Sequence, residues 1–250
     1  MLILHSTAHA TVKSVVRLHD SKERKARKLC IVEGVRTLTS VLEGGLILEA
    51  LYCTEEQTNQ AHALVSPQFI TLVSDQVMQK MSSSVSPSGL LGVFRIPKSP
   101  PHEELSSGLV LAQIADPGNM GTLIRTAAAC GVRSVVVIEG TDPWSPKVIQ
   151  ASAGTCATLQ IFQWDWETLI TVKKDLQLYA LVVEGGTSPT LIDPSHALLV
   201  VGNEAHGIPS LWLKQCDSVI TLPMPGKTES LNAAVAGSLA LYFTFVLKNV

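Results

Sequence analysis

Short apolar runs alternate with amphipathic helical patterns along the whole chain. In its first part, the runs that predict strands lie at residues 29–33, 48–53, 69–73 and 90–96. Apolar positions three and four residues apart predict helices there near residues 35–42, 56–64 and 75–81. Strands separated by helices in this way predict an α/β fold rather than an all-α or all-β one.

The same alternation continues in the second part of the chain. The runs that predict its strands lie at residues 109–115, 134–139, 157–162, 178–183, 197–202 and 219–222. Helices are expected between them, one of them over residues 122–130. We therefore expect a second α/β unit with a largely parallel sheet.

A proline-rich segment separates the two parts. Residues 97–104 carry Pro97, Pro100 and Pro101 and show no apolar period. The sequence thus predicts a smaller domain over residues 1–96, a linker over 97–107 and a larger domain over 108–250.

The last predicted helix, over residues 231–247, is apolar on nearly all sides. A membrane span needs about 20 residues, and this run is shorter, so we expect it in the core or in a subunit contact. Only 16% of the residues are charged and 46% are hydrophobic, whereas a typical soluble protein has roughly 25% charged residues. Low charge and an apolar last helix both favour a homodimer and no membrane partner.

The near-neutral net charge of -2 hides a basic N-terminal segment. Residues 1–40 hold eight Lys or Arg against three Asp or Glu, which is typical of a module that binds a polyanion such as RNA. The alternative is a solvated helix face over residues 21–28. Five cysteines without a C-x-x-C pair argue against a disulfide framework and a zinc site, so no metal is expected. The first residues lack a secretory signal pattern, and we expect a cytoplasmic protein.

Three polar, glycine-bearing loops follow apolar strands, where ligands bind in parallel α/β sheets. In the first loop, residues 116–121, Asn119 is either a helix cap or a site residue. Arg125 lies off the apolar stripe of the following helix, which suits either an exposed or a functional arginine.

The second loop, residues 202–209, begins with Gly202, which permits close backbone approach to a ligand, and carries Glu204 at the rim. In the third loop, residues 222–232, Ser230 and Asn232 precede the apolar last helix and need a cap or a ligand as partner. Its Gly-Lys-Thr at 226–228 lacks the earlier glycine of a phosphate-binding loop, and no G-x-G-x-x-G follows any strand.

Taken together, the three loops resemble the three motifs of the SpoU/TrmH family of RNA ribose 2′-O-methyltransferases, which depend on S-adenosylmethionine (AdoMet). The matching patterns are Asn119-x5-Arg125, Gly202-Asn203-Glu204-x2-Gly207 and Leu222-Pro223-Met224-x-Gly226-x3-Ser230-Leu231-Asn232. Residues 145–154 are also similar to the family stretch at that place. Residues 31–36 and 89–93 resemble the ribosomal-protein-like α/β domain that often precedes the catalytic one, with His9 where the family pattern has Asn.

This resemblance implies a C-terminal domain with a trefoil knot, AdoMet bound in the knot, a homodimer, and rRNA or tRNA as the substrate. It assigns Gly202, Leu222 and Leu231 to the cofactor pocket and Asn119, Arg125, Glu204, Ser230 and Asn232 to the active site. In the family, the arginine that matches Arg125 is proposed to activate the 2′-hydroxyl. A guanidinium is a poor base, so a cationic role for Arg125 with Glu204 as proton acceptor stays open.

Two other functions remain as alternatives. One is an RNA-binding protein whose methyltransferase-like domain is inactive, although all five polar site residues are present. The other is an enzyme that acts on small nucleotides, which would have no need of the basic N-terminal module.

Overall fold

The computed structural model describes residues 3–226 and 230–247. The chain forms two compact units, one of which joins the residues up to Lys98 with Trp144–Ala157. The other joins Ser99–Pro143 with the residues from Thr158 onward. The segment 144–157, which the sequence assigns to the larger domain, thus groups with the first unit. Most of the Gly-Lys-Thr tripeptide at 226–228 lies outside the described residues.

A four-stranded mixed sheet forms the centre of the first unit, in the order β1-β4-β2-β3. Its strands are β1 (Leu29–Glu33), β2 (Leu48–Cys53), β3 (Ile70–Leu72) and β4 (Leu90–Arg95). Strand β4 runs antiparallel to both β1 and β2, whereas β2 and β3 are parallel.

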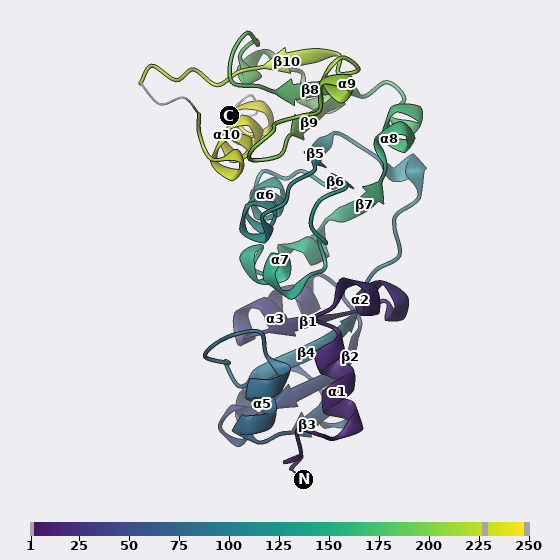
Figure 1. Cartoon of the computed structure of the whole chain (residues 1–250), viewed down its shortest axis with the longest axis vertical. Helices are drawn as coiled ribbons and strands as arrows, with labels where there is room; N and C mark the ends of the chain where they lie inside the picture. Colours follow the sequence, from purple (N-terminus) through teal and green to yellow (C-terminus); the bar gives the residue numbers. More distant parts are fainter. Residues whose placement is uncertain (1–2, 227–229, 248–250) are drawn as a thin grey trace. The chain divides into compact units, whose positions relative to one another are not determined.

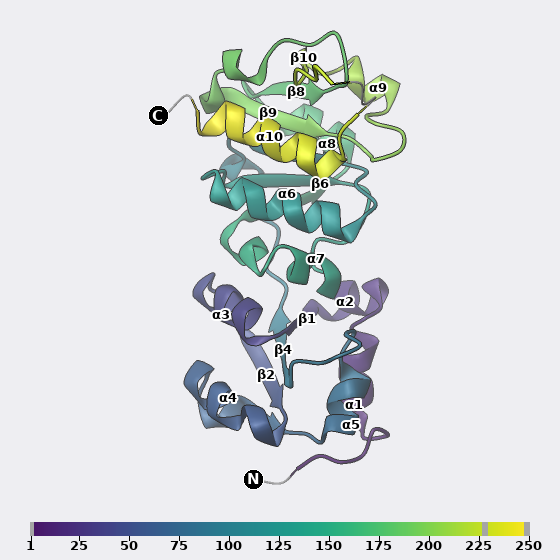
Figure 2. The same ribbon diagram turned by 90° about the vertical axis from the view of Figure 1, so that its left-hand side faces the viewer.

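Helices cover both faces of this sheet: α1 and α5 lie on one side, and α3 and α4 on the other (Figure 2). Val12 and Val15 of α1 pack with Val77 and Met78 of α5 in one buried cluster that includes Ile31 of β1. His9 accepts a hydrogen bond from the amide of Thr11 and so caps α1. The helical elements of this unit are α1 (Ala10–Arg17), α2 (Ser21–Arg27), α3 (Val35–Glu43), η1 (Glu55–Gln57), α4 (Thr58–Leu64), η2 (Pro67–Phe69), α5 (Asp75–Met81) and α7 (Pro146–Ala151), with η4 (Thr155–Thr158) at its boundary.

The basic N-terminal segment is only partly free to meet a partner. Arg24 is 3% exposed, and its Nη1 donates to the carbonyls of Leu18 and His19 at 2.9 Å each. These bonds satisfy carbonyl groups at and just beyond the end of α1, which is a structural role. The exposed cations of α1, α2 and the turn after α2 are Lys13, Arg17, Lys22, Lys25 and Lys28.

The second unit contains a six-stranded parallel sheet in the order β10-β8-β9-β5-β6-β7 (Figure 1). The strands are β5 (Gly108–Ala112), β6 (Ser134–Ile138), β7 (Gln160–Trp164), β8 (Gln177–Leu181), β9 (Ala197–Val201) and β10 (Ser218–Ile220). Strands β5, β6 and β9 are buried over their whole length, as a sheet covered on both faces requires. The predicted α/β fold with a parallel sheet is therefore confirmed.

Helices α6 and α10 lie side by side on one face of this sheet (Figures 1 and 2). A Cβ on Gly237 of α10 would lie 2.5 Å from Cδ2 of Leu123 of α6, so a larger residue there would have to displace this side chain. On the other face, Trp166 of α8 stacks on Trp212 of α9 with ring centroids 4.9 Å apart. The helical elements of this unit are η3 (His102–Glu104), α6 (Pro117–Ala129), α8 (Trp166–Val172), η5 (Pro189–Leu191), η6 (Pro194–His196), α9 (Ser210–Leu213) and α10 (Ala233–Phe245).

Helix α10 confirms a predicted helix, but only one of its sides is buried. Its buried residues are Ala234, Gly237, Ala240, Leu241 and Thr244, whereas Val235, Leu239 and Tyr242 are 48%, 39% and 47% exposed. Within the described ranges, no helix is both long and apolar enough to cross a bilayer.

Candidate functional site

The three loops singled out in the sequence follow strands β5, β9 and β10 at the carboxyl edge of the parallel sheet. Strands β5 and β9 are neighbours in the sheet, so the loops that follow them meet. The third loop runs from β10 to the start of α10, which packs against α6. The fold thus brings together residues that lie 85 and 113 positions apart in the chain.

Asp116, rather than Asn119, caps the helix in the first loop. Helix α6 begins at Pro117, earlier than the predicted residue 122, and the Asp116 carboxylate accepts from the Asn119 amide at 2.7 Å. The alternative that Asn119 is the cap is therefore wrong. The Asn119 side chain lies in the first turn of α6 and is available to the other loops.

A chain of hydrogen bonds connects one predicted site residue from each loop. The Asn232 Nδ2 donates to Asn119 Oδ1 at 3.1 Å, and the Asn119 Nδ2 donates to Glu204 Oε1 at 2.9 Å. Asn232 also caps α10, because its Oδ1 accepts from the amides of Ala234 and Val235. The donors and acceptors of the three side chains are thus largely used to hold the loops to one another.

The Glu204 carboxylate is an acceptor for both side-chain and backbone donors. Besides Asn119, it accepts from the amides of Ala115 at 3.3 Å and Asp116 at 3.2 Å. Partial burial by itself would raise the pKa of Glu204, but these hydrogen bonds to the charged form outweigh it and leave the pKa below its ordinary value. Glu204 is therefore ionised and a weak base at neutral pH.

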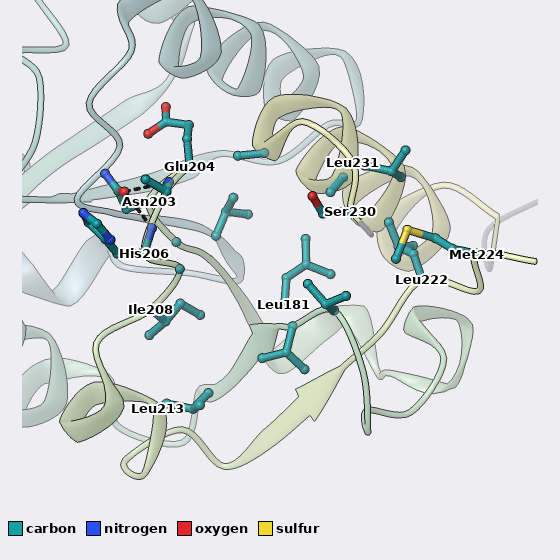
Figure 3. Close-up of a pocket in the computed structure, with 18 residues that line it drawn as sticks. Leu181, Asn203, Glu204, His206, Ile208, Leu213, Leu222, Met224, Ser230 and Leu231 are labelled. Atoms are coloured by element: carbon teal, nitrogen blue, oxygen red, sulfur yellow. Dashed lines mark hydrogen bonds between the residues drawn. The ribbon is translucent and has the colours of Figure 1, made fainter. Parts of the chain in front are cut away.

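A pocket of about 450 Å³ lies beside this hydrogen-bonded chain. Its lining includes Gly202, Leu222 and Leu231, the three predicted cofactor residues, together with Glu204 and Ser230. Figure 3 shows Leu181, Leu222 and other apolar side chains around the middle of the pocket, with Asn203, Glu204 and His206 grouped at one end. The pocket combines an apolar middle with a polar end, which suits a nucleoside with a charged tail.

The tight packing at Gly202 comes from its own loop. A Cβ at this position would lie 2.5 Å from the carbonyl carbon of Gly207 and 2.6 Å from the amide nitrogen of Ile208. A larger residue would therefore displace the loop backbone before it could fill the pocket. The structure thus gives a reason for glycine at position 202 that lies within the loop itself.

Arg125 does not line the pocket of its own chain. Its side chain is exposed on α6 and, among the residues whose structure is described, it has no ion pair. Ser230 lines the pocket, and its hydroxyl makes no hydrogen bond to another described residue. Arg125 and Ser230 are thus the two predicted polar site residues whose side chains make no hydrogen bond or ion pair to another described residue.

Sequence reasoning did not assign a role to Asn203 or Gln113, which also connect these loops. The Asn203 side chain donates to the carbonyl of Gln113 at 2.9 Å, and Gln113 has a φ of 59°. An asparagine after a strand-ending glycine is a turn signal that could have identified Asn203. Nothing in the sequence indicates the left-handed conformation of Gln113. The described residues contain no group of three or more His, Cys, Asp or Glu placed to hold a metal ion.

The fold and the pocket define an α/β protein with a candidate ligand site at the carboxyl edge of a parallel sheet. Residues 107–242 match the model of the SpoU rRNA methylase family, and the chain belongs to this family. Residues 9–92 match the MRM3-like substrate-binding domain.

Three similar proteins cover nearly the whole chain. An uncharacterized tRNA/rRNA methyltransferase of Synechocystis is 32% identical over 95% of this chain and 91% of its own. The crystal structure of an RNA 2′-O ribose methyltransferase is 28% identical, covers 100% of both chains and superposes with a TM-score of 0.84. An AdoMet-bound rRNA methyltransferase of Sinorhizobium meliloti has the same fold, with 24% identity, a TM-score of 0.85 and coverage of 97% of both chains.

Proposed function

We propose that this protein transfers a methyl group from AdoMet to the ribose 2′-hydroxyl of a nucleotide in rRNA or tRNA. The observation that carries this proposal is the chain Asn232–Asn119–Glu204, which joins the three family motifs beside the pocket. The relative with a 2′-O ribose methyltransferase name spans the full chain, which agrees with it.

The residues of the pocket fit AdoMet. A volume of about 450 Å³ falls in the range of roughly 300 to 1,000 Å³ that small-molecule sites occupy. The apolar lining from Leu181, Leu222 and Ile208 suits an adenine ring, and the backbone of Gly202 and its neighbours supplies polar partners. Glu204 offers a negative charge at the polar end, where a cationic group would be favoured.

When bound, AdoMet supplies an electrophilic methyl group on a sulfonium. The protein must hold the accepting hydroxyl in line with that methyl group and help to remove its proton. We assign Glu204, Asn119 and Asn232 the role of fixing the three loops, because their side-chain hydrogen bonds are directed at one another. We assign contact with the RNA to Ser230 and Arg125. The guanidinium cation of Arg125 can bind a phosphate and stabilise a developing alkoxide.

We propose that the exposed cations of α1 and α2 bind the RNA backbone. Lys22, Lys25 and Lys28 are exposed and close in sequence, and the match of residues 9–92 to a substrate-binding domain agrees with this role. Arg24 is excluded, because its guanidinium is buried against the end of α1. The domain division at residues 97–107 then separates RNA capture from methyl transfer.

The exposed side of α10 supports a homodimer. Val235, Leu239 and Tyr242 lie four and three residues apart and so share one face of the helix. An exposed apolar face on an otherwise buried helix favours contact with a second copy.

From the family match we also propose a trefoil knot in the C-terminal part of the chain. The chain from β10 to α10 runs against segment 187–191: the Thr221 amide donates to the carbonyl of Thr187 at 3.0 Å, and Thr244 Oγ1 donates to that of Pro189 at 3.5 Å. An experimental structure that traces residues 181–247 without a break tests this threading.

The proposed reaction can be tested in two steps with the full-length protein. Isothermal titration with AdoMet should give saturable binding at about one site per chain. Transfer of tritium-labelled methyl groups to rRNA or tRNA should then give a product that survives alkaline hydrolysis at one mapped nucleotide, because a methylated 2′-oxygen cannot attack the phosphate. RNA binding without methyl transfer would instead indicate an inactive domain, and methylation of free nucleosides would indicate a small-molecule enzyme.

A further inference from the structure

The side chain of Asn203 holds the second loop in two directions at once. Its Oδ1 accepts from the amides of Ala205 at 2.9 Å and His206 at 3.1 Å (Figure 3). Its Nδ2 donates to the carbonyl of Gln113 at 2.9 Å, just beyond the end of β5. The loop is also closed by a pair of backbone hydrogen bonds between Asn203 and Gly207 at 3.0 and 2.9 Å.

Gln113, the acceptor of this bond, is itself fixed in an unusual conformation. Its φ of 59° lies in the left-handed region, which is uncommon for a residue other than glycine. Its amide donates to the carbonyl of Ile138 at 2.9 Å, and its side-chain Nε2 donates to Glu139 at 2.5 Å. The backbone and the side chain of Gln113 are thus both held by hydrogen bonds. The side-chain Nδ2 of Asn203 therefore donates to a carbonyl whose position is fixed.

We propose that Asn203 is a positioning residue for the methyl transfer: it locks the loop that forms one wall of the pocket onto the strand end that leads to Asn119. The inference rests on the proposed function, because it assigns a role relative to the AdoMet pocket. Gly202, Asn203 and Glu204 all line that pocket. A shift of this loop would therefore move the pocket wall and the acceptor of Asn119 together.

The chemistry of the position favours asparagine over other side chains. An acceptor must face the two loop amides while a donor faces Gln113, and a short side chain must do both. An ionised aspartate has acceptors but no donor. It would still accept from the amides of Ala205 and His206, but it would place a negatively charged oxygen against the carbonyl of Gln113. Once protonated, the same carboxyl group could donate to that carbonyl and restore the bond.

This difference gives a test with the full-length protein and its cofactor. At pH 8, Asn203→Asp should bind AdoMet about tenfold to a hundredfold more weakly than the parent by calorimetry, since a half-buried acceptor loses its donor. The ratio of the AdoMet affinity of Asn203→Asp to that of the parent should be at least threefold higher at pH 4.5 than at pH 8. Asn203→Ala should be weakened without any such recovery.

Other titratable groups around the position are present in all three proteins, so the comparison with the parent and Asn203→Ala removes their effect. They come from the ends of β5 and β6 and from the loop itself: Asp116, Glu139, Glu204 and His206. Parent-like affinity of Asn203→Asp at pH 8, or a pH response equal to that of Asn203→Ala, would overturn the proposal. If Asn203→Asp is unfolded at pH 8, refolding on acidification by circular dichroism supports it, and failure to refold overturns it.

The proposed function can fail separately from this inference. If the parent does not bind AdoMet, hydrogen exchange of the Gly207 amide tests the lock without a ligand. The protection factor of this amide at pH 8 should be at least tenfold lower in Asn203→Asp than in the parent. Equal protection in the two proteins would refute a locking role.

Discussion

Replacing the Glu204 carboxylate by an amide tests whether this residue positions the site or accepts the proton. The carboxylate accepts three hydrogen bonds, from Asn119 Nδ2 at 2.9 Å and from the amides of Asp116 and Ala115 at 3.2 and 3.3 Å. Glu204→Gln keeps the size of the side chain but has one acceptor oxygen. Its NH2 group must then face at least one donor, which weakens the connection between the second and first loops.

The size of the effect follows from these bonds. A hydrogen bond to a charged acceptor contributes about 1.5–3 kcal/mol when it is sheltered from water. Glu204 is exposed, and two of its hydrogen bonds are long. The amide oxygen of glutamine can still accept some of these bonds. We therefore expect the variant to lose only about 1–2 kcal/mol of this stabilisation. If this loss raises the activation free energy by the same amount, the rate of methyl transfer falls about fivefold to thirtyfold.

The assay is single-turnover methyl transfer to RNA, together with calorimetric AdoMet affinity. We expect the AdoMet affinity of Glu204→Gln to fall by less than about tenfold, because the side chain keeps its size while the negative charge at the polar end of the pocket is lost. Glu184→Gln is a matched control: Glu184 is exposed beyond the end of β8 and makes no hydrogen bond or ion pair to another described residue. Asn119→Ala combined with Glu204→Gln should cost little more than either change alone, since the two side chains form one unit.

Two results would refute this reasoning. A rate within twofold of the parent would mean that the carboxylate does not position Asn119. A loss of a thousandfold or more would exceed what these bonds can supply and would match the loss of a proton acceptor.

The same variant also has a defined pH signature. The pKa of Glu204 is held below its ordinary value of 4.5 in the folded chain, so its stabilising effect is present above that value and is lost as the pH falls through the folded pKa. The difference in unfolding free energy between the parent and Glu204→Gln should thus be constant above about pH 5.5 and shrink in more acidic solution. A difference that grows on acidification would contradict the assignment.

Three further outcomes are expected. Arg125→Ala should abolish methyl transfer and leave AdoMet affinity within about threefold, since Arg125 does not line the pocket; measurable turnover of Arg125→Lys would support a cationic role, and its absence would argue for the guanidinium fork. Replacing Lys22, Lys25 and Lys28 by Gln should weaken RNA binding and reduce the salt slope by up to roughly 0.7–0.9 log units per lost contact, whereas an unchanged slope would mean that these lysines only face solvent. Leu239→Asp, on the exposed side of α10, should convert a dimer to a monomer in sedimentation experiments, and an unchanged dimer would place the interface elsewhere.

The apolar pattern predicted the elements of the fold well because the strands are short and buried. The predicted strands at 29–33 and 48–53 coincide with β1 and β2. The strand predicted over 109–115 ends at Ala112 instead, because Gln113 turns into the left-handed region. Hydrophobicity continues past that point, so no periodicity could have marked the turn.

Charge counting was less reliable than apolar periodicity. Arg24 adds one positive charge to the basic segment in the sequence, yet its side chain is buried against the backbone carbonyls of Leu18 and His19. The sequence cannot separate a cation that binds its own backbone from one that faces solvent, since both occur on polar helix positions. Arg24 therefore does not contribute to an RNA-binding surface, although its charge counts in the basic segment.

The hydrogen-bonded chain through Asn119 shows what the motif spacing could and could not provide. The family resemblance selected Asn119, Glu204 and Asn232 as site residues, and the sequence offered a helix cap or a ligand as partners for the two asparagines, but not their hydrogen bonds to one another and to Glu204. In the folded chain, Asn232 caps α10 and donates to Asn119, which donates to Glu204. Such pairing depends on the strand order that places β5 next to β9 and on the packing of α10 against α6. Because these groups largely satisfy one another, we expect the RNA to bind mainly to the site side chains that the hydrogen-bonded chain leaves free, Arg125 and Ser230.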